Sequence, residues 1–179
     1  MFGNMQLLLV EDDSAMRTTL QRTLMRRGLH VDVAADGPSA LAHWQTREPD
    51  AVVLDNVDAG QRLVRHLVEN GHRRIVFFYG AASATGRQRL AGYQDALAAV
   101  GLTPVSQALK PTTDKARAAM RHFMERHSQL PDAIVASSGL ILLGLVEALR
   151  EADLSYPDDV ALAGFDDMPW TRIITPSIT

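Results

Sequence analysis

The sequence contains no cysteine. Disulfide bonds and thiolate chemistry are therefore excluded. The six histidines offer no alternative metal-binding pattern. His122 and His127 are separated by five positions, which misses the i, i+4 spacing that places two ligands on one helix face. We expect these histidines to be solvated or to cap helices.

A strong net charge and long apolar runs are also absent. Lys and Arg number 18 against 21 Asp and Glu, so the formal net charge is −3. Bulk charge of this size does not indicate a nucleic-acid or membrane surface. The first apolar run, LLLV (7–10), has no basic segment before it and is too short for a signal peptide or a membrane span. We expect a cytoplasmic protein.

Short apolar runs alternate with amphipathic stretches along all 179 residues, a length sufficient for one domain or two small lobes. The runs are rich in Val, Ile, Leu and Phe without strict alternation, as in strands buried on both faces. This order predicts an α/β fold, with parallel sheets and helices on both faces. The predicted strands are QLLLV (6–10), HVDVAA (30–35), AVVLD (51–55), RIVFFY (74–79), PVSQAL (104–109), AIVAS (133–137) and VALAGF (160–165).

Carboxylates lie at the carboxyl ends of the first and third predicted strands. Glu11 and Asp12 follow QLLLV, and Asp55 ends AVVLD. Neighbouring strands lie about 4.8 Å apart, so the three side chains would converge if these strands pair. Crowded carboxylates repel one another unless a cation joins them. A hard divalent ion with oxygen ligands, Mg²⁺ first, is the expected partner.

Residues 6–55 resemble the first half of a bacterial response-regulator receiver domain, which has a flavodoxin-like fold. VEDD (10–13), HVDVAADGPSALAHW (30–44) and PDAVVLD (49–55) carry this resemblance. The resemblance implies Glu11 and Asp12 as Mg²⁺ ligands, Asp55 as phosphoacceptor and the Val57 carbonyl as a further ligand.

The receiver pattern weakens after Asp55. The sequence continues DNVDAGQ (55–61), without the usual proline-containing loop. Gly80 stands where the family has a hydroxyl residue, with Ser83 as a displaced substitute. Lys110 in ALKP (108–111) resembles the receiver lysine, although its neighbours fit another family better.

Residues 55–179 resemble the C-terminal ligand-binding lobe of the lac-repressor family, related to periplasmic sugar-binding proteins. GHRRI (71–75), RLAGY (89–93), PDAI (131–134) and YPDDVALAGFDD (156–167) carry this resemblance in order. It implies that Arg89 and Asp166 contact a sugar-like or purine-like ligand. The alternatives are an ion pair for Arg89 and a turn or cap acid for Asp166. Ser138 and Gly139 depart from the family, whose members often have polar or acidic ligand-contacting residues there.

The two resemblances meet at Asp55 and Asn56, so we predict a receiver-like unit over 1–55 and a periplasmic-binding-protein-like lobe over 56–179. The simplest interpretation is an engineered or recombined chimera, not an enzyme, without evolved activity and with at most a vestigial Mg²⁺ cluster. The alternatives are a sugar- or purine-binding module and a receiver phosphorylated on Asp55. No helix-turn-helix is seen, so no nucleic-acid partner is expected.

Two architectures fit these strands. Either two units pack separately, or all seven strands form one continuous sheet. The repressor-type order places PVSQAL and AIVAS on either side of RIVFFY, which leaves no room for AVVLD there and favours two units. AVVLD would then be a sheet edge, through which a homodimer could form.

Asp55→Asn tests the acidic cluster. If Glu11, Asp12 and Asp55 converge, the substitution relieves repulsion and raises the melting temperature of the metal-free protein, while the stabilisation by Mg²⁺ falls. Thermal unfolding with and without millimolar Mg²⁺ measures both effects. Intact-mass analysis after incubation with acetyl phosphate tests phosphorylation, which Lys110→Ala should abolish without loss of Mg²⁺ binding. Unchanged stability and Mg²⁺ response in Asp55→Asn would show that the cluster is not assembled.

Overall fold

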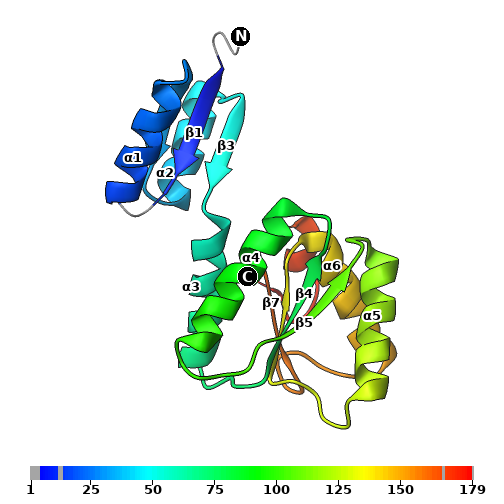
Figure 1. Cartoon of the computed structure of the whole chain (residues 1–179). Helices are drawn as coiled ribbons and strands as arrows, with labels where there is room; N and C mark the ends of the chain where they lie inside the picture. The colour runs from blue at the N-terminus through cyan, green and yellow to red at the C-terminus, as the bar shows by residue number, and fades with distance from the viewer. Residues whose placement is uncertain (1–4, 12–13, 167, 179) are drawn as a thin grey trace. The chain divides into compact units, whose positions relative to one another are not determined.

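Strands and helices alternate along the chain in a computed structural model that describes residues 5–11, 14–166 and 168–178. The predicted α/β class with parallel sheets is confirmed. The described strands form two sheets, so the alternative of one continuous sheet is wrong. The chain divides into two compact units, Met1–Asp55 and Asn56–Thr179 (Figure 1).

The first unit contains a three-stranded parallel sheet in the order β2-β1-β3. Its core is small: Leu7, Leu9 and Val31 are buried, and Leu20 and Leu24 of α1 pack against them. The elements are β1 (Gln6–Val10), α1 (Ser14–Met25), β2 (His30–Ala34), α2 (Gly37–Arg47) and β3 (Ala51–Leu54).

Strand β3 is an edge of this sheet, because its only neighbour in the described sheet is β1. Val53 and Leu54 of β3 are 38% and 52% exposed. An exposed strand edge is a surface on which another strand can pair. A homodimer through β3 therefore stays a prediction.

The second unit has a four-stranded parallel sheet in the order β5-β4-β6-β7. The predicted placement of β5 and β6 on either side of β4 is confirmed. The elements are α3 (Asn56–Glu69), β4 (Ile75–Gly80), α4 (Ala84–Ala98), β5 (Val105–Leu109), α5 (Thr113–Arg126), β6 (Ala133–Ala136), α6 (Gly139–Glu151), β7 (Ala161–Gly164) and the 3-10 helix η1 (Pro169–Arg172).

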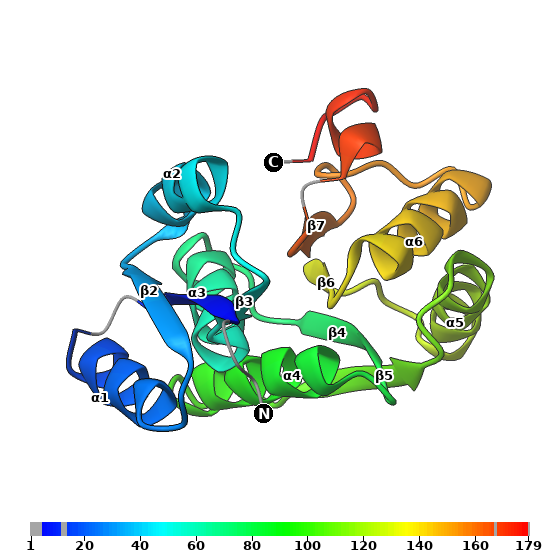
Figure 2. The ribbon, with the colours of Figure 1, turned by 90° about the horizontal axis from the view of Figure 1, so that it is seen from above.

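Strand β4 explains the continuous apolar runs of the sequence. Ile75 and Phe77 belong to the core that contains Tyr93 and Leu97 of α4, whereas Val76 and Phe78 belong to the opposite core. Successive side chains of a strand point to opposite faces, so helices on both faces require apolar residues at every position. Figures 1 and 2 show α3 and α4 on one face of this sheet and α5 and α6 on the other.

Helices α3 and α4 approach each other closely at two glycines. A Cβ atom on Gly92 would collide with the carbonyl oxygen of Val57, and one on Gly60 would collide with the carbonyl oxygen of Arg89. These obstacles are backbone atoms, which a side-chain rotation cannot move. The start of α3 is therefore fixed against α4, near Arg89, which lines the cavity described below. Among the described helices, none is long and apolar enough to cross a membrane.

Gly92→Ala should lower the stability of the second unit by about 1–3 kcal/mol, the usual cost of overpacking a tight contact. Gly37→Ala is the matched control, because nothing lies within 4 Å of a Cβ atom there. The control should change stability by less than about 0.5 kcal/mol. Urea unfolding followed by circular dichroism measures both variants. Equal stability of Gly92→Ala and the parent chain would contradict the packing of α3 on α4.

Candidate functional site

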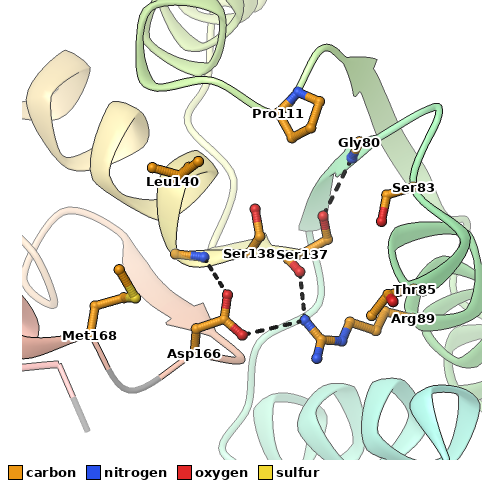
Figure 3. Close-up of a pocket in the computed structure, with 11 residues that line it drawn as sticks. Gly80, Ser83, Thr85, Arg89, Pro111, Ser137, Ser138, Leu140, Asp166 and Met168 are labelled. Carbon is orange, nitrogen blue, oxygen red and sulfur yellow. Dashed lines mark hydrogen bonds and ion pairs between the residues drawn. The ribbon is translucent and has the colours of Figure 1, made fainter. Parts of the chain in front are cut away.

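A cavity of about 460 Å³ opens at the carboxyl ends of the strands in the second unit. This edge of a parallel sheet is where ligands bind in open α/β folds. Gly80 ends β4, Ser137 follows β6, and Asp166 lies just beyond β7. Figure 3 shows the lining residues, which are Gly80, Ser83, Thr85, Arg89, Pro111, Ser137, Ser138, Gly139, Leu140, Asp166 and Met168.

Arg89 lies within α4, and its side chain is only 12% exposed. Its Nε donates to Oδ1 of Asn56 at 3.1 Å, and its Nη1 donates to the carbonyl oxygen of Ser137 at 2.7 Å. The guanidinium carbon lies 4.3 Å from the centroid of the Phe165 ring. Arg89 therefore ties α4 to the start of α3, the end of β6 and the end of β7.

The charge of Arg89 is balanced within the cavity. Burial lowers the pKa of Arg89, and the neighbouring carboxylate of Asp166 opposes that shift. An arginine keeps its proton even when partly buried. Nη1 of Arg89 lies 3.7 Å from Oδ1 of Asp166, and Figure 3 shows the two side chains pointing toward each other.

Asp166 is held from the other side by helix α6. Its Oδ2 accepts a hydrogen bond from the backbone N–H of Gly139 at 2.7 Å. Negative charge at a helix N-terminus is favourable, so this contact fixes the carboxylate. The side chain remains 40% exposed. A carboxylate oxygen accepts more than one hydrogen bond, and Asp166 can therefore also accept one from a ligand.

Four small hydroxyl side chains complete the polar part of the lining. Ser83 Oγ accepts from Gly86 N at 3.1 Å and caps α4. Ser137 Oγ accepts a longer bond, 3.4 Å, from Gly80 N. Ser138 Oγ is buried without a hydrogen-bond partner among the described residues. A buried hydroxyl without a partner is costly, so a ligand that bonds to Ser138 would remove that cost.

The structure brings Arg89 and Asp166 together, as a shared ligand site requires, while leaving their contact with a ligand untested. Sequence reasoning missed Ser137 and Thr85 as lining residues. Ser137 had a usable signal, because it directly follows a buried strand. No pattern in the sequence marked Thr85, because its position in the lining depends on the direction of α4 after the end of β4.

The acidic residues of the first unit are placed by the register of its sheet. Val10 and Leu54 are paired on β1 and β3, so Glu11 and Asp55 follow neighbouring positions. Asp12, the third predicted ligand, lies outside the described residues. No trio of potential metal ligands occurs in the described part of the chain. Because that part omits Asp12, the Mg²⁺ cluster stays a prediction.

Two details differ from the receiver pattern. Val57, whose carbonyl was expected to complete the metal site, is the second residue of α3, and that carbonyl faces Gly92. Lys110 follows β5, in a different sheet from β3 and Asp55. The partnership of Lys110 with Asp55 stays a prediction.

The family model of the periplasmic binding protein-like domain matches residues 64–179. The chain belongs to this family. The response regulator receiver domain also matches, over residues 7–97. Both predicted resemblances are therefore supported, and the two matched ranges overlap at 64–97.

Named relatives are transcriptional regulators. The HTH-type transcriptional regulator CelR of Thermobifida fusca is 36% identical over 133 residues, which cover 72% of this chain and 38% of CelR. A probable opine utilization operon repressor of Rhizobium rhizogenes is 34% identical over 136 residues, which cover 70% of this chain and 69% of the repressor. The chain thus spans about two fifths of the length of CelR.

A solved structure shares the fold of nearly the whole chain. The sugar-binding transcriptional regulator of the LacI family from Escherichia coli, complexed with phosphate, aligns with a TM-score of 0.65 and 21% identity. The alignment covers 98% of this chain and 83% of that regulator. Residues of the first unit are therefore included in the shared fold.

These comparisons correct the prediction of an engineered or recombined scaffold without evolved activity. The relatives are regulators that match most of this chain, one of them at 36% identity, and the shared fold extends through both units. The alternative of a small-molecule binding module agrees better with these findings.

Arg89→Lys should destabilise the second unit by about 1.5–3 kcal/mol, the range for hydrogen bonds to charged groups. A lysine cannot reproduce the forked contacts to Asn56 and Ser137 or the stacking on Phe165. Arg150→Lys, at an exposed position of α6, is the control and should change stability by less than about 0.5 kcal/mol. Urea unfolding measures both. Equal effects of the two substitutions would show that Arg89 does not tie these elements together.

Proposed function

We propose that residues 56–179 form the small-molecule sensing lobe of a transcriptional regulator and that the ligand is a sugar or a related polyhydroxyl compound. The observation that carries this proposal is the Arg89–Asp166 pair, 3.7 Å apart, in the lining of the strand-end cavity. A hydroxyl group both donates and accepts hydrogen bonds. Adjacent hydroxyls on a sugar can therefore accept from the guanidinium and donate to the carboxylate.

The dimensions and lining of the cavity agree with this ligand class. A volume of about 460 Å³ lies within the range of small-molecule pockets, about 300–1,000 Å³. Both charged groups are held by protein contacts before a ligand arrives, so little ordering is left to oppose binding. The named relatives are transcriptional regulators, and the E. coli neighbour is described as sugar-binding.

We propose a binding role and no catalysis at this site. The lining contains serine and threonine hydroxyls, and among the lining residues that the structure describes only Arg89 and Asp166 are ionisable. Both are held by protein contacts, Arg89 by Asn56 and Ser137 and Asp166 by Gly139. A serine nucleophile needs an adjacent general base that is itself oriented by a third group, and the described lining does not supply that base.

For residues 1–55 we propose a receiver-like unit that can bind Mg²⁺ through Glu11, Asp12 and Asp55. The receiver match over 7–97 supports this proposal. So does the parallel pairing of β1 with β3, which sets Glu11 and Asp55 after paired residues. The Mg²⁺ response of Asp55→Asn tests it.

Asp166→Asn tests the sugar site. The asparagine side chain keeps an oxygen that can accept the hydrogen bond from Gly139 N–H. It lacks the negatively charged carboxylate that would accept a hydrogen bond from a ligand hydroxyl. A hydrogen bond to a charged group contributes about 1.5–3 kcal/mol, so affinity should fall about ten- to a hundredfold. Isothermal titration calorimetry against a panel of pentoses, hexoses, disaccharides and nucleosides measures it.

Asp158→Asn is the control, because Asp158 is exposed and does not line the cavity. It should leave affinity unchanged. If no compound of the panel binds the parent chain, or if the two variants bind equally well, the proposed site is wrong.

A further inference from the structure

The edge strand of the first unit is open along its backbone. The N–H of Asp50 donates to the carbonyl oxygen of Gln6 at 2.8 Å, where the pairing of β3 with β1 begins. Backbone groups of a strand alternate in direction, so Ala51 and Val53 direct their N–H and C=O groups away from β1. Among the described residues, β1 is the only strand that pairs with β3. Another strand can therefore bond to Ala51 and Val53.

Both faces of β3 carry exposed apolar side chains. Helices α1 and α2 pack on β1 and β2. Val53 pairs with Leu9, which lies in the core beneath α1, and Leu54 points to the opposite face. Val53 is 38% exposed and Leu54 is 52% exposed. A strand added at this edge would leave them uncovered unless it brought further apolar side chains with it.

Helix α2 covers the face of the sheet that contains Leu54. Arg47 of α2 forms a 2.9 Å salt bridge with Asp32 of β2. Asp32 is paired with Leu8 on β1, and Leu8 is paired with Val52 on β3. Paired residues of neighbouring strands point to the same face. Val52 and Leu54, two positions apart, therefore share the face on which α2 lies.

Two exposed apolar side chains of α2 lie on the side toward β3. Ser39, Ala40 and His43 are the partly covered residues of this helix, so they mark its side against the sheet. At about 3.6 residues per turn, Trp44 lies about a quarter turn beyond them and Leu41 lies further round. A right-handed crossover from β2 to β3 places that quarter turn on the β3 side. Leu41 is 59% exposed and Trp44 is 50% exposed.

Two copies of the chain complement each other at this edge. Strand β3 (Ala51–Leu54) contains no charged residue, whereas edge strands that avoid pairing often carry one. A two-fold axis perpendicular to the sheet would set two β3 strands antiparallel and edge to edge. The same rotation keeps both α2 helices on one face, each with Trp44 toward the shared edge. Each copy then supplies the strand that the other lacks and the apolar side chains that cover it.

The carboxylates at the two ends of β3 select the register of such a pair. With Val53 opposite Val53 of the second copy, Asp55 lies opposite Ala51 of that copy. The residues with outward-facing backbone groups, Ala51 and Val53, then both form hydrogen bonds across the edge. A register centred between Val52 and Val53 would set Asp55 opposite Asp50, and like charges directly opposite each other are destabilising. It would also place the two α2 helices on opposite faces.

We propose that the first units of two chains pair through β3 into one sheet in the order β2-β1-β3-β3-β1-β2, with Leu41 and Trp44 of both copies covering Leu54 at the shared edge. The contact is isologous and closes at two copies. This inference is independent of the proposed sugar site, because it uses only residues of the first unit.

Sedimentation velocity on the full chain tests the association. From low-micromolar to sub-millimolar concentration, we expect a reversible shift from the 19.6 kDa chain to its dimer. Val53→Lys should raise the dissociation constant at least about tenfold, because two lysines would lie opposite each other at the shared edge. Trp44→Ala should raise it by a similar factor, because it removes the apolar cover. Met25→Lys is the control: Met25 is 54% exposed on α1, and this variant should associate like the parent chain.

A single introduced cysteine tests the register, because the chain contains none of its own. The Cα atoms of a hydrogen-bonded antiparallel pair lie about 5.5 Å apart, within the range of about 4.4–6.8 Å that a disulfide spans. Mild oxidation should therefore join two copies of Val53→Cys into a covalent dimer, measured on a non-reducing gel. Met25→Cys should stay monomeric under the same conditions. This pair of variants decides the register even if Val53→Lys does not fold.

Two results would overturn the proposal. One is a chain that sediments as a monomer at every concentration, with no covalent dimer of Val53→Cys. The other is a dimer that folded Val53→Lys and Trp44→Ala leave unchanged, because that dimer would form through a different surface. Circular dichroism establishes that each variant is folded. The calorimetric result for the sugar site changes neither outcome, so the failures of the two proposals are distinguishable.

Discussion

The partly buried guanidinium of Arg89 holds the cavity of the second unit together. It contacts Asn56 at the start of α3, Ser137 at the end of β6, and Phe165 and Asp166 after β7. These segments are far apart in the sequence and meet because parallel strands end at one edge of the sheet. An arginine suits this place because its planar fork bonds in two directions while its face stacks on an aromatic ring.

Asn56 contacts Arg89 and also lies at the boundary between the two units. It is the first residue of the second unit, and its side chain bonds to both Arg89 and Gln88 on α4. At Gly60 and Gly92 the backbones of α3 and α4 lie so close that a Cβ atom would not fit, and the first turns of α3 are therefore packed tightly against α4. The second unit is therefore well defined from its first residue, and the change of sequence pattern at Asp55 coincides with a structural boundary.

The interpretation as an inert chimera was wrong because it inferred a lack of function from the junction of two resemblances. Strand–helix repeats look alike across α/β families, since all obey the same burial and connection rules. A receiver-like and a repressor-like pattern can thus follow each other within one natural fold. The fold of one solved regulator aligns with 98% of this chain, including residues of both units.

The family resemblance pointed to Arg89 and Asp166, whereas local pattern alone identified the seven strands and the helices between them. These elements can be predicted from the sequence because strands buried on both faces appear as short apolar runs and helices appear as amphipathic stretches. The order β5-β4-β6 also followed, through the family resemblance. The pairing of Arg89 with Asp166, the bracing by Asn56 and the packing of Met168 over Gly139 were not visible. Each joins residues from different elements, and the distance between them is set by strand order, helix direction and close backbone contact, which only the folded chain determines.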